Sequence, residues 1–195
     1  RLHWRSHFIQ KLEDQPSIEH TSFIPVYDQI REKDEEKLEA WIEGKTGVHF
    51  IDACMIYLRN YGWINFRMRA MLASFASYNL WLDWRYFAPR LAALFTDFEP
   101  GIHYSQIQMQ SGTTGINTIR MYNPYKQAMD QDPLGKFIKS QIPEVKNFPP
   151  AFFHNPPKKS LNVNLFDNEF QKEIINVKET AQYARKKIFD IRKSQ

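Results

Sequence analysis

Apolar residues recur every three or four positions over most of the chain, which is the spacing of one face of an α-helix. The longest such run extends from Ile64 to Leu82. Shorter runs predict helices at 2–12, within 27–42, and at 48–60, 84–95, 134–142 and 177–192. The sequence has no period-two alternation that would indicate strands. The pattern therefore predicts an all-α fold, with residues 1–195 in a single domain.

Two stretches do not follow this pattern. Residues 97–115 have no clean period and contain a proline and three glycines, so the sequence predicts a loop with short helical pieces. Residues 44–47 read Gly-Lys-Thr-Gly, like the end of a phosphate-binding loop, but Glu39 stands where that motif requires glycine. We therefore interpret 44–47 as a turn leading into the next helix.

Composition narrows the possible functions. Aromatic residues make up 15% of the 195 positions, which favours either a dense core or a site that uses rings, such as a cofactor or base-stacking pocket. The net charge of +4 permits phosphate-bearing partners without requiring them. No apolar run approaches the length of a membrane span. The single Cys54 excludes an internal disulfide and fits a reducing, cytoplasmic location.

Charged residues near the middle of the chain have two interpretations each. Arg67 and Arg69 form a solvated face, or one of them turns inward and pairs with an acid such as Asp97 or Glu99, because a buried guanidinium needs a partner. The two acids form a helix-end turn, or they serve acid–base chemistry, a metal or ribose hydroxyls. His103 is the only further metal ligand nearby, so we expect no metal site.

Tryptophans accompany cations in several places, as in Trp4-Arg5. Rings beside cations are typical of a base-stacking surface. Most tryptophans in a small domain lie in the core, so for each one alone, including Trp63 and Trp84, the pattern favours packing over a functional role. Spacing alone does not decide between these interpretations.

Six blocks, taken together, resemble the flavin-binding helical domain of DNA photolyases and cryptochromes. They match in order and spacing over almost the whole chain: LxWRxHF at 2–8, AWIEGKTGxxFIDACM at 40–55, GWIxxRMRAMLASF at 62–75, LDWR at 82–85, DFEPGIHYSQ at 97–106 and YNP at 122–124. The resemblance implies a helical bundle that holds folded FAD. Family members begin with an α/β antenna domain and a Thr/Ser-rich diphosphate loop. This chain opens after that loop, so we expect a truncated form.

The resemblance also assigns residues to the flavin. Arg69 falls on an arginine that lies against the flavin and pairs with an aspartate, here Asp97. Glu99 replaces the usual second aspartate. His103 falls at or near the position facing flavin N5, usually Asn in photolyases and Asp or Cys in cryptochromes. The implied FAD contacts are Trp63, Arg69, Asp97, Phe98, Glu99 and His103.

A second set of residues is implied for DNA. Trp4 matches the tryptophan that stacks on the lesion, and Arg5 follows it as in the family. Phe66 and Arg67 fall where an Asn-Arg pair contacts the substrate. Gln127 matches a glutamine on the DNA side.

The electron-relay tryptophans depart most from the family pattern. Trp84 matches the middle member, but the surface member falls near Arg31 and no tryptophan follows Trp84 anywhere in the chain. Trp81, Tyr104 or Tyr122 are candidate substitutes.

The resemblance implies an FAD-dependent, light-driven lyase in which reduced flavin donates an electron to a pyrimidine dimer in DNA. Three departures argue against simple dimer repair. Arg1 falls where photolyases have a glutamate that hydrogen-bonds the damaged bases, Phe66 stands in place of an asparagine, and the second lesion-stacking tryptophan is absent because no tryptophan follows Trp84. One alternative is a cryptochrome-like blue-light photoreceptor without repair activity. Another is an incomplete fragment that has the fold but binds FAD weakly, because the phosphate loop is missing.

Overall fold

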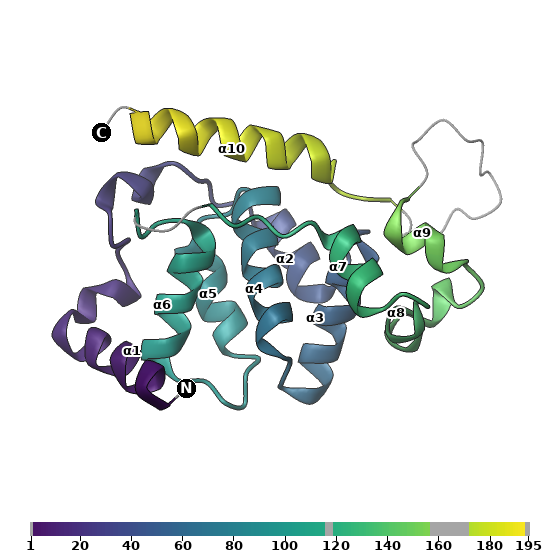
Figure 1. Cartoon of the computed structure of the whole chain (residues 1–195), viewed down its shortest axis with the longest axis horizontal. Coiled ribbons are helices and arrows are strands. Elements are labelled where there is room, and N and C mark those ends of the chain that lie inside the picture. Colours follow the sequence, from purple (N-terminus) through teal and green to yellow (C-terminus); the bar gives the residue numbers. More distant parts are fainter. Residues whose placement is uncertain (1, 116–118, 157–171, 194–195) are drawn as a thin grey trace.

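The computed structural model describes residues 2–115, 119–156 and 172–193; Arg1 lies outside these ranges. The described residues form a helical bundle without strands, apart from one isolated bridge between Glu32 and Leu82 (Figure 1). The all-α prediction is therefore confirmed. The α-helices are α1 Leu2–Asp14, α2 Glu35–Glu43, α3 His49–Tyr61, α4 Phe66–Ser74, α5 Trp84–Ala92, α6 Pro100–Ser111, α7 Pro124–Gln131, α8 Lys136–Gln141, α9 Pro150–His154 and α10 Val177–Lys193. Short 3-10 turns lie at Pro16–Glu19, Pro25–Gln29 and Pro143–Val145.

Side-chain caps fix where six of these helices begin. The residue before the helix accepts a hydrogen bond from a backbone N–H of the first turn, which would otherwise lack a partner. The capping residues of α2, α4, α5, α6, α7 and α10 are Asp34, Asn65, Asp83, Glu99, Asn123 and Asn176. Polar residues at these positions thus set the bundle's element boundaries.

The prediction of a loop at 97–115 was wrong for its central part. Residues Pro100–Ser111 form the 12-residue helix α6, which ends at Gly112 in a left-handed conformation with φ 70°. One side of α6 packs against α1, so closely that a Cβ on Gly101 would lie 2.7 Å from the carbonyl oxygen of Phe8. Another side carries polar residues that line a cavity. The sequence of α6 therefore lacks regularly spaced apolar residues, although the segment forms a helix.

The long run at 64–82 is two kinds of helix rather than one. After α4 the chain widens into a π-helical turn at Phe75–Asn79, where the N–H of Leu80 donates to the carbonyl oxygen of Phe75 at 3.0 Å. It then passes through Trp81, whose φ of 58° is unusual for a residue with a side chain. The indole Nε1 of Trp81 donates to the carbonyl oxygen of Ile30 at 3.0 Å, and the Arg31 guanidinium lies 5.0 Å from its ring. These contacts stabilise the strained backbone.

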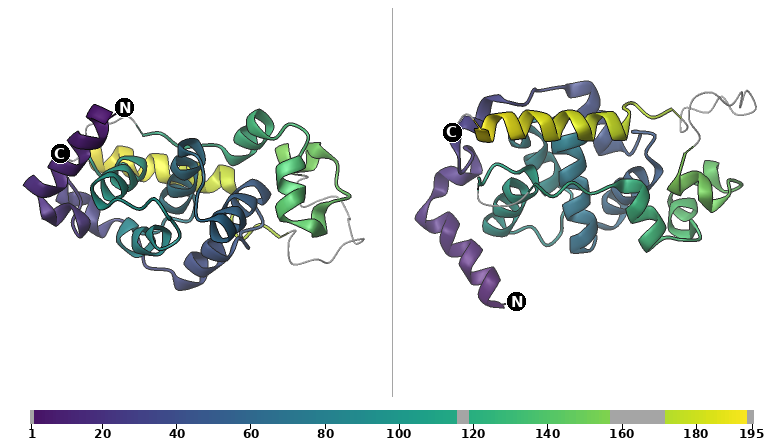
Figure 2. Two further views of the ribbon diagram at one scale, coloured as in Figure 1. Left: turned by 90° about the horizontal axis from the view of Figure 1, so that it is seen from below. Right: turned by 45° about the horizontal axis from the view of Figure 1, so that its top comes forward.

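The core lies between α2, α3, α4 and α5, where Trp41 and Trp84 are fully buried. A smaller cluster forms under α10, where Ala184 and Ile188 pack against Tyr27 and Tyr78. Helix α10 lies across one side of the bundle, with α1 at one end of the molecule and α7, α8 and α9 at the other (Figures 1 and 2).

The segment 44–47 is a turn, as predicted. The Asp52 carboxylate accepts hydrogen bonds from the N–H and hydroxyl of Thr46, at 2.9 and 2.6 Å, and from the N–H of Gly47 at 2.8 Å. Burial raises the pKa of Asp52 to about 7, against the effect of these three bonds. Gly47 has φ 78°, and a Cβ there would lie 2.4 Å from the carbonyl oxygen of Lys172. Glycine is therefore needed at position 47 because the backbone at Lys172 packs directly against it.

Candidate functional site

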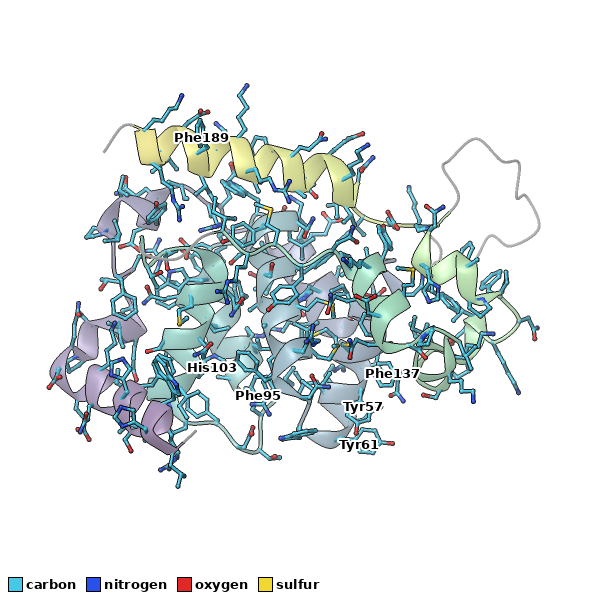
Figure 3. All side chains as sticks on the ribbon, in the orientation of Figure 1. Tyr57, Tyr61, Phe95, His103, Phe137 and Phe189 are labelled. Carbon is cyan, nitrogen blue, oxygen red and sulfur yellow. The ribbon has the colours of Figure 1, made fainter. Side chains whose placement is uncertain are left out.

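A cavity of about 310 Å³ lies between α4, α5 and α6. This volume is at the lower end of the range for small-molecule sites. The small side chains of Ala70 and Ala73 leave room on the α4 side, and Phe95 and His103 lie at this site in Figure 3. Most of the lining is apolar. The polar side chains that line the cavity are Arg69, Asp97, Glu99, His103, Gln106 and Gln110.

Arg69 turns inward and is held on three sides. Its Nη2 donates to Asp97 Oδ2 at 2.9 Å, and its Nε donates to the carbonyl oxygen of Ile64 at 2.7 Å. The guanidinium carbon lies 4.2 Å from the centre of the Phe95 ring. Arg67, two residues earlier, is exposed. The sequence left open which arginine faces inward, and the structure selects Arg69.

Glu99 borders the cavity, but its carboxylate is already engaged. One oxygen accepts from the N–H of Gly101 at 3.2 Å and the other from the N–H of Ile102 at 2.8 Å. An acid at this position also interacts favourably with the positive end of the helix dipole. The helix-end interpretation therefore describes Glu99, while Asp97 is the acid that pairs with arginine.

His103 is neutral in the folded protein. Burial, with a smaller contribution from the charge of Arg69, lowers the pKa of its imidazole to about 4. Its Nε2 lies 2.9 Å from the carbonyl oxygen of Ala88. Because a carbonyl can only accept, Nε2 carries the proton and Nδ1 is left as an acceptor. The cavity wall thus contains a fixed imidazole tautomer beside a permanent cation.

Gln106 and Gln110 are cavity residues that the sequence analysis missed. The amide oxygen of each is buried and has no hydrogen-bond partner among the described residues. Gln110 is only 8% exposed. An unpaired buried amide costs about 1–3 kcal/mol, so these oxygens are available to a ligand that donates hydrogen bonds. The spacing Ile102, Gln106, Gln110 is the signal that could have revealed them, because it marks one face of a helix.

Four of the five residues implied for DNA are exposed on two helices next to the cavity. Trp4 and Arg5 lie on α1, and Phe66 and Arg67 lie at the start of α4; Trp4 and Phe66 are each 62% exposed. Gln127 is separate from this group. It lies on α7 towards the other end of the molecule, and its side chain is buried (Figure 1).

A row of rings connects Trp84 with the cavity. Trp84 is buried, and its Nε1 donates to the hydroxyl of Ser22 at 2.9 Å. Its ring packs edge-on against Tyr104, with 6.4 Å between centroids. Tyr104 in turn lies 5.2 Å from the His103 ring and 6.5 Å from the Phe98 ring, both of which line the cavity. Of the candidate substitutes, Tyr104 is the one in contact with Trp84.

Two further properties concern the described ranges only. No group of three or more His, Cys, Asp or Glu side chains is gathered there in a way that could hold a metal ion. Among the helices of residues 2–115, 119–156 and 172–193, none is both long and apolar enough to cross a membrane.

Comparison with known sequences gives a consistent result. Residues 1–190 match the family described as the FAD binding domain of DNA photolyase. The deoxyribodipyrimidine photo-lyase of Escherichia coli K12 is 32% identical over 163 residues, which is 80% of this chain and 34% of that protein. The enzyme of the same name from Vibrio cholerae is 36% identical over 127 residues, or 63% and 27%. The chain thus spans about a third of the length of these curated relatives.

Solved structures show the same fold. The archaeal photolyase from Sulfolobus tokodaii, described with two FAD molecules, superposes with a TM-score of 0.86 at 32% identity, covering 97% of this chain and 43% of that one. The Synechocystis cryptochrome superposes with a TM-score of 0.81 at 24% identity, over 94% and 39%. At that identity the second likeness concerns the fold alone.

Proposed function

The chain belongs to the family of FAD-binding domains of DNA photolyases, and from this premise we propose that it serves light-driven repair of pyrimidine dimers in DNA. The cavity between α4, α5 and α6 is the proposed site of the flavin ring. The observation that carries the proposal is the Arg69–Asp97 pair in the wall of a cavity that is also lined by the unpaired amide oxygen of Gln110.

The lining residues suit a flavin. A flavin ring is planar, apolar on its faces, and polar along one edge, where it has both an N–H donor and carbonyl acceptors. The unpaired oxygens of Gln106 and Gln110 are acceptors for such a donor, and Arg69 supplies donors for such carbonyls. The cavity volume of about 310 Å³ suits the ring system rather than the whole dinucleotide.

When bound, FAD would supply light absorption and the electron given to the dimer. The protein's part is to hold and tune it. Arg69 places a permanent cation beside the ring and so favours its reduced, negatively charged form. Asp97 and the Ile64 carbonyl fix the direction of the guanidinium. His103 adds an acceptor at Nδ1 without adding a second positive charge.

The exposed residues beside the cavity are the proposed contacts to DNA. The rings of Trp4 and Phe66 suit stacking on unpaired bases, and Arg5 and Arg67 suit phosphates. Base stacking by a single ring is typically worth about 1–3 kcal/mol. A lesion whose bases leave the helix would therefore be held at the entrance of the cavity.

Reconstitution tests the proposal. The purified chain is mixed with FAD, freed of excess cofactor and examined by visible spectroscopy. It is then incubated with an oligonucleotide containing a pyrimidine dimer, under blue light and in darkness. We expect flavin absorbance that stays with the protein, and light-dependent loss of the dimer. Absence of retained flavin would overturn the proposal at its first step.

A second candidate function is a blue-light photoreceptor without repair. It is favoured by one observation: no tryptophan follows Trp84, and the ring that leads from Trp84 to the cavity is Tyr104. A photoreceptor would retain FAD and respond to blue light while leaving the dimer unchanged in the same assay.

A further inference from the structure

The positive charge of this protein is concentrated in a single helix. The whole chain has 26 Lys and Arg against 22 Asp and Glu, a net charge of +4. Helix α10 has six of these cations and only two of the acids, Glu179 and Asp190, so it accounts for all of the net charge. The six cations of α10 are Lys178, Arg185, Lys186, Lys187, Arg192 and Lys193.

Five of the six cations are exposed, all but the partly buried Arg192. Within residues 2–115, 119–156 and 172–193, none of the five is in an ion pair. Nitrogen-tipped side chains project away from the bundle along α10 in Figure 3. Lys178 and Arg185, like Lys186 and Lys193, are seven residues apart, which puts them on nearly the same side about 10.5 Å apart. The helix thus presents unneutralised charge at regular intervals along its outer side.

The opposite side of α10 is already in use. Val177, Ala184 and Ile188 are buried, the last two against Tyr27 and Tyr78. A helix that binds a lipid surface needs a free apolar face to insert below the headgroups. Because the apolar face of α10 is packed on the bundle, its charges do not serve that kind of binding.

Exposed rings accompany these cations. Tyr183 is 49% exposed and Phe189 is 55% exposed. The ammonium of Lys187 lies 5.6 Å from the Tyr183 ring, and that of Lys193 lies 4.7 Å from the Phe189 ring, which is labelled in Figure 3. Rings interleaved with cations along an extended surface are typical of proteins that track a nucleic-acid strand, because bases stack and phosphates pair. A chain of regularly spaced phosphates fits this rod better than the irregular acids of a globular partner.

The α10 surface is separate from the cavity. Helix α6 lies between them: its residues from Ile102 to Gln110 line the cavity, while a Cβ on its last cap, Gly112, would meet the Tyr78 hydroxyl at 2.4 Å. Tyr78 belongs to the cluster under α10. A strand held on α10 is therefore not the strand whose bases enter the cavity.

We propose that the exposed cations of α10 bind the phosphate backbone of a nucleic acid, without sequence preference, at this second surface. The proposal does not depend on flavin chemistry. It requires the charge pattern of α10 and the docking of that helix on the bundle.

Two matched triple variants test it. One changes Lys178, Lys186 and Lys193 to Gln on α10. The control changes Lys126, Lys136 and Lys146 to Gln; these are also exposed and lie on or near α7 and α8. Both lose the same net charge. Binding of a labelled, dimer-free single strand of about 20 nucleotides, longer than one binding site, is followed by fluorescence anisotropy at several salt concentrations.

We expect the α10 triple to bind at least tenfold more weakly at low salt, and the slope of log K against log[salt] to become shallower by about 2, since each phosphate contact on a single strand contributes about 0.7. The control should keep the wild-type slope. If both triple variants lose the same affinity, the effect is due to net charge alone and the proposal is wrong. Unchanged binding in both variants would also overturn it. Loss of binding to phosphatidylserine vesicles, with oligonucleotide binding intact, would assign the surface to a membrane instead.

The result of this binding test does not depend on whether the proposed repair function is correct. The assay is run without FAD, on undamaged DNA, and with the full chain. A Trp4→Ala variant removes an uncharged ring from the lesion-side surface, so it can weaken stacking but should keep the wild-type salt slope, which only lost phosphate contacts make shallower. If changing Arg5 and Arg67 to Gln together lowers the salt slope by about 2 while the α10 triple leaves it unchanged, the phosphates lie on the lesion side and α10 is not the site.

Discussion

At the cavity, Arg69 is three-quarters buried, and its guanidinium contacts a carboxylate, a carbonyl and an aromatic ring. On α10, five cations extend into solvent with no acid paired to them in the described parts of the chain. The same type of charge is thus used in two physically different ways within one small bundle. The cavity fixes one cation in position, whereas α10 spaces several along a line.

The two settings predict different behaviour. A cation in a partly desolvated wall acts over a few ångströms, with little screening and strong dependence on geometry. Exposed cations act over longer distances and lose their effect as salt rises, because the screening length is about 8 Å at physiological ionic strength. The cavity should therefore respond to single substitutions, and α10 to the number of charges and to salt.

The largest effect is expected from Arg69→Gln. It removes the cation from the cavity wall and leaves Asp97 without its partner, so FAD affinity should fall by about 100-fold, in the upper part of the 1.5–3 kcal/mol range for hydrogen bonds to charged groups. Flavin fluorescence titration measures this.

Arg90→Gln is the matched control for that variant, because Arg90 pairs with Glu35 and Glu39 on the surface away from the cavity. Exposed pairs of this kind contribute little. If both variants lose FAD equally, the role given to Arg69 is wrong.

His103 gives the second effect, through pH. The folded protein holds its imidazole at a pKa of about 4, while the unfolded chain takes up a proton below about 6.5. Between these values the unfolded state binds more protons, so the free energy of unfolding falls as pH falls. From pH 7 to pH 5 the contribution of this residue is a loss of about 2 kcal/mol.

His103→Gln should remove that contribution, since an amide does not titrate here and the Gln side chain is long enough to donate to the Ala88 carbonyl from the position of the imidazole Nε2. Urea unfolding of both proteins at pH 7 and pH 5 measures it. The variant should lose less stability than wild type on acidification. Parallel losses would show that burial does not hold this imidazole neutral.

The helices that the sequence predicted well are those with one apolar and one solvated side. Helices α3 and α10 were placed to within one residue at each end, because their apolar stripes face the core. Helix α6 was missed because neither of its packed sides follows the apolar pattern. One side has a glycine that allows a close approach to α1, and the other has glutamines that line the cavity. The spacing of apolar residues reveals neither the close glycine contact nor the glutamines that face the cavity.

The site was predictable in part. The resemblance named Arg69 and Asp97, and their pairing follows from the cost of burying an unpaired guanidinium. The four-residue spacing of Gln106 and Gln110 indicates a shared helix face, but only the structure shows that this face borders a cavity and not solvent. The contact between Trp84 and Tyr104 depends on how α5 and α6 pack, which pattern alone does not give.

Tyr104→Phe addresses the row of rings and should have a moderate effect. We propose that electrons reach the cavity from Trp84 by way of Tyr104, so removal of the phenol should slow photoreduction of bound FAD by about tenfold, or 1.4 kcal/mol in the barrier. Trp84→Phe should have a similar effect. Transient absorption measures both, and unchanged rates in the two variants would rule out this path.

The smallest effect is expected when a change on α10 is measured by its influence on FAD binding in the cavity. The α10 triple, Lys178, Lys186 and Lys193 to Gln, should change FAD affinity by less than twofold at physiological salt. The exposed lysines of α10 are separated from the cavity by α6, and exposed charges are strongly screened at physiological ionic strength, where the screening length is about 8 Å. At low ionic strength the screening length grows to about 30 Å, and a small weakening of FAD binding should then emerge. The same titration at low and physiological salt checks this. A large loss at both salt concentrations would mean that α10 and the cavity are coupled through packing, and the separation of the two surfaces would not stand.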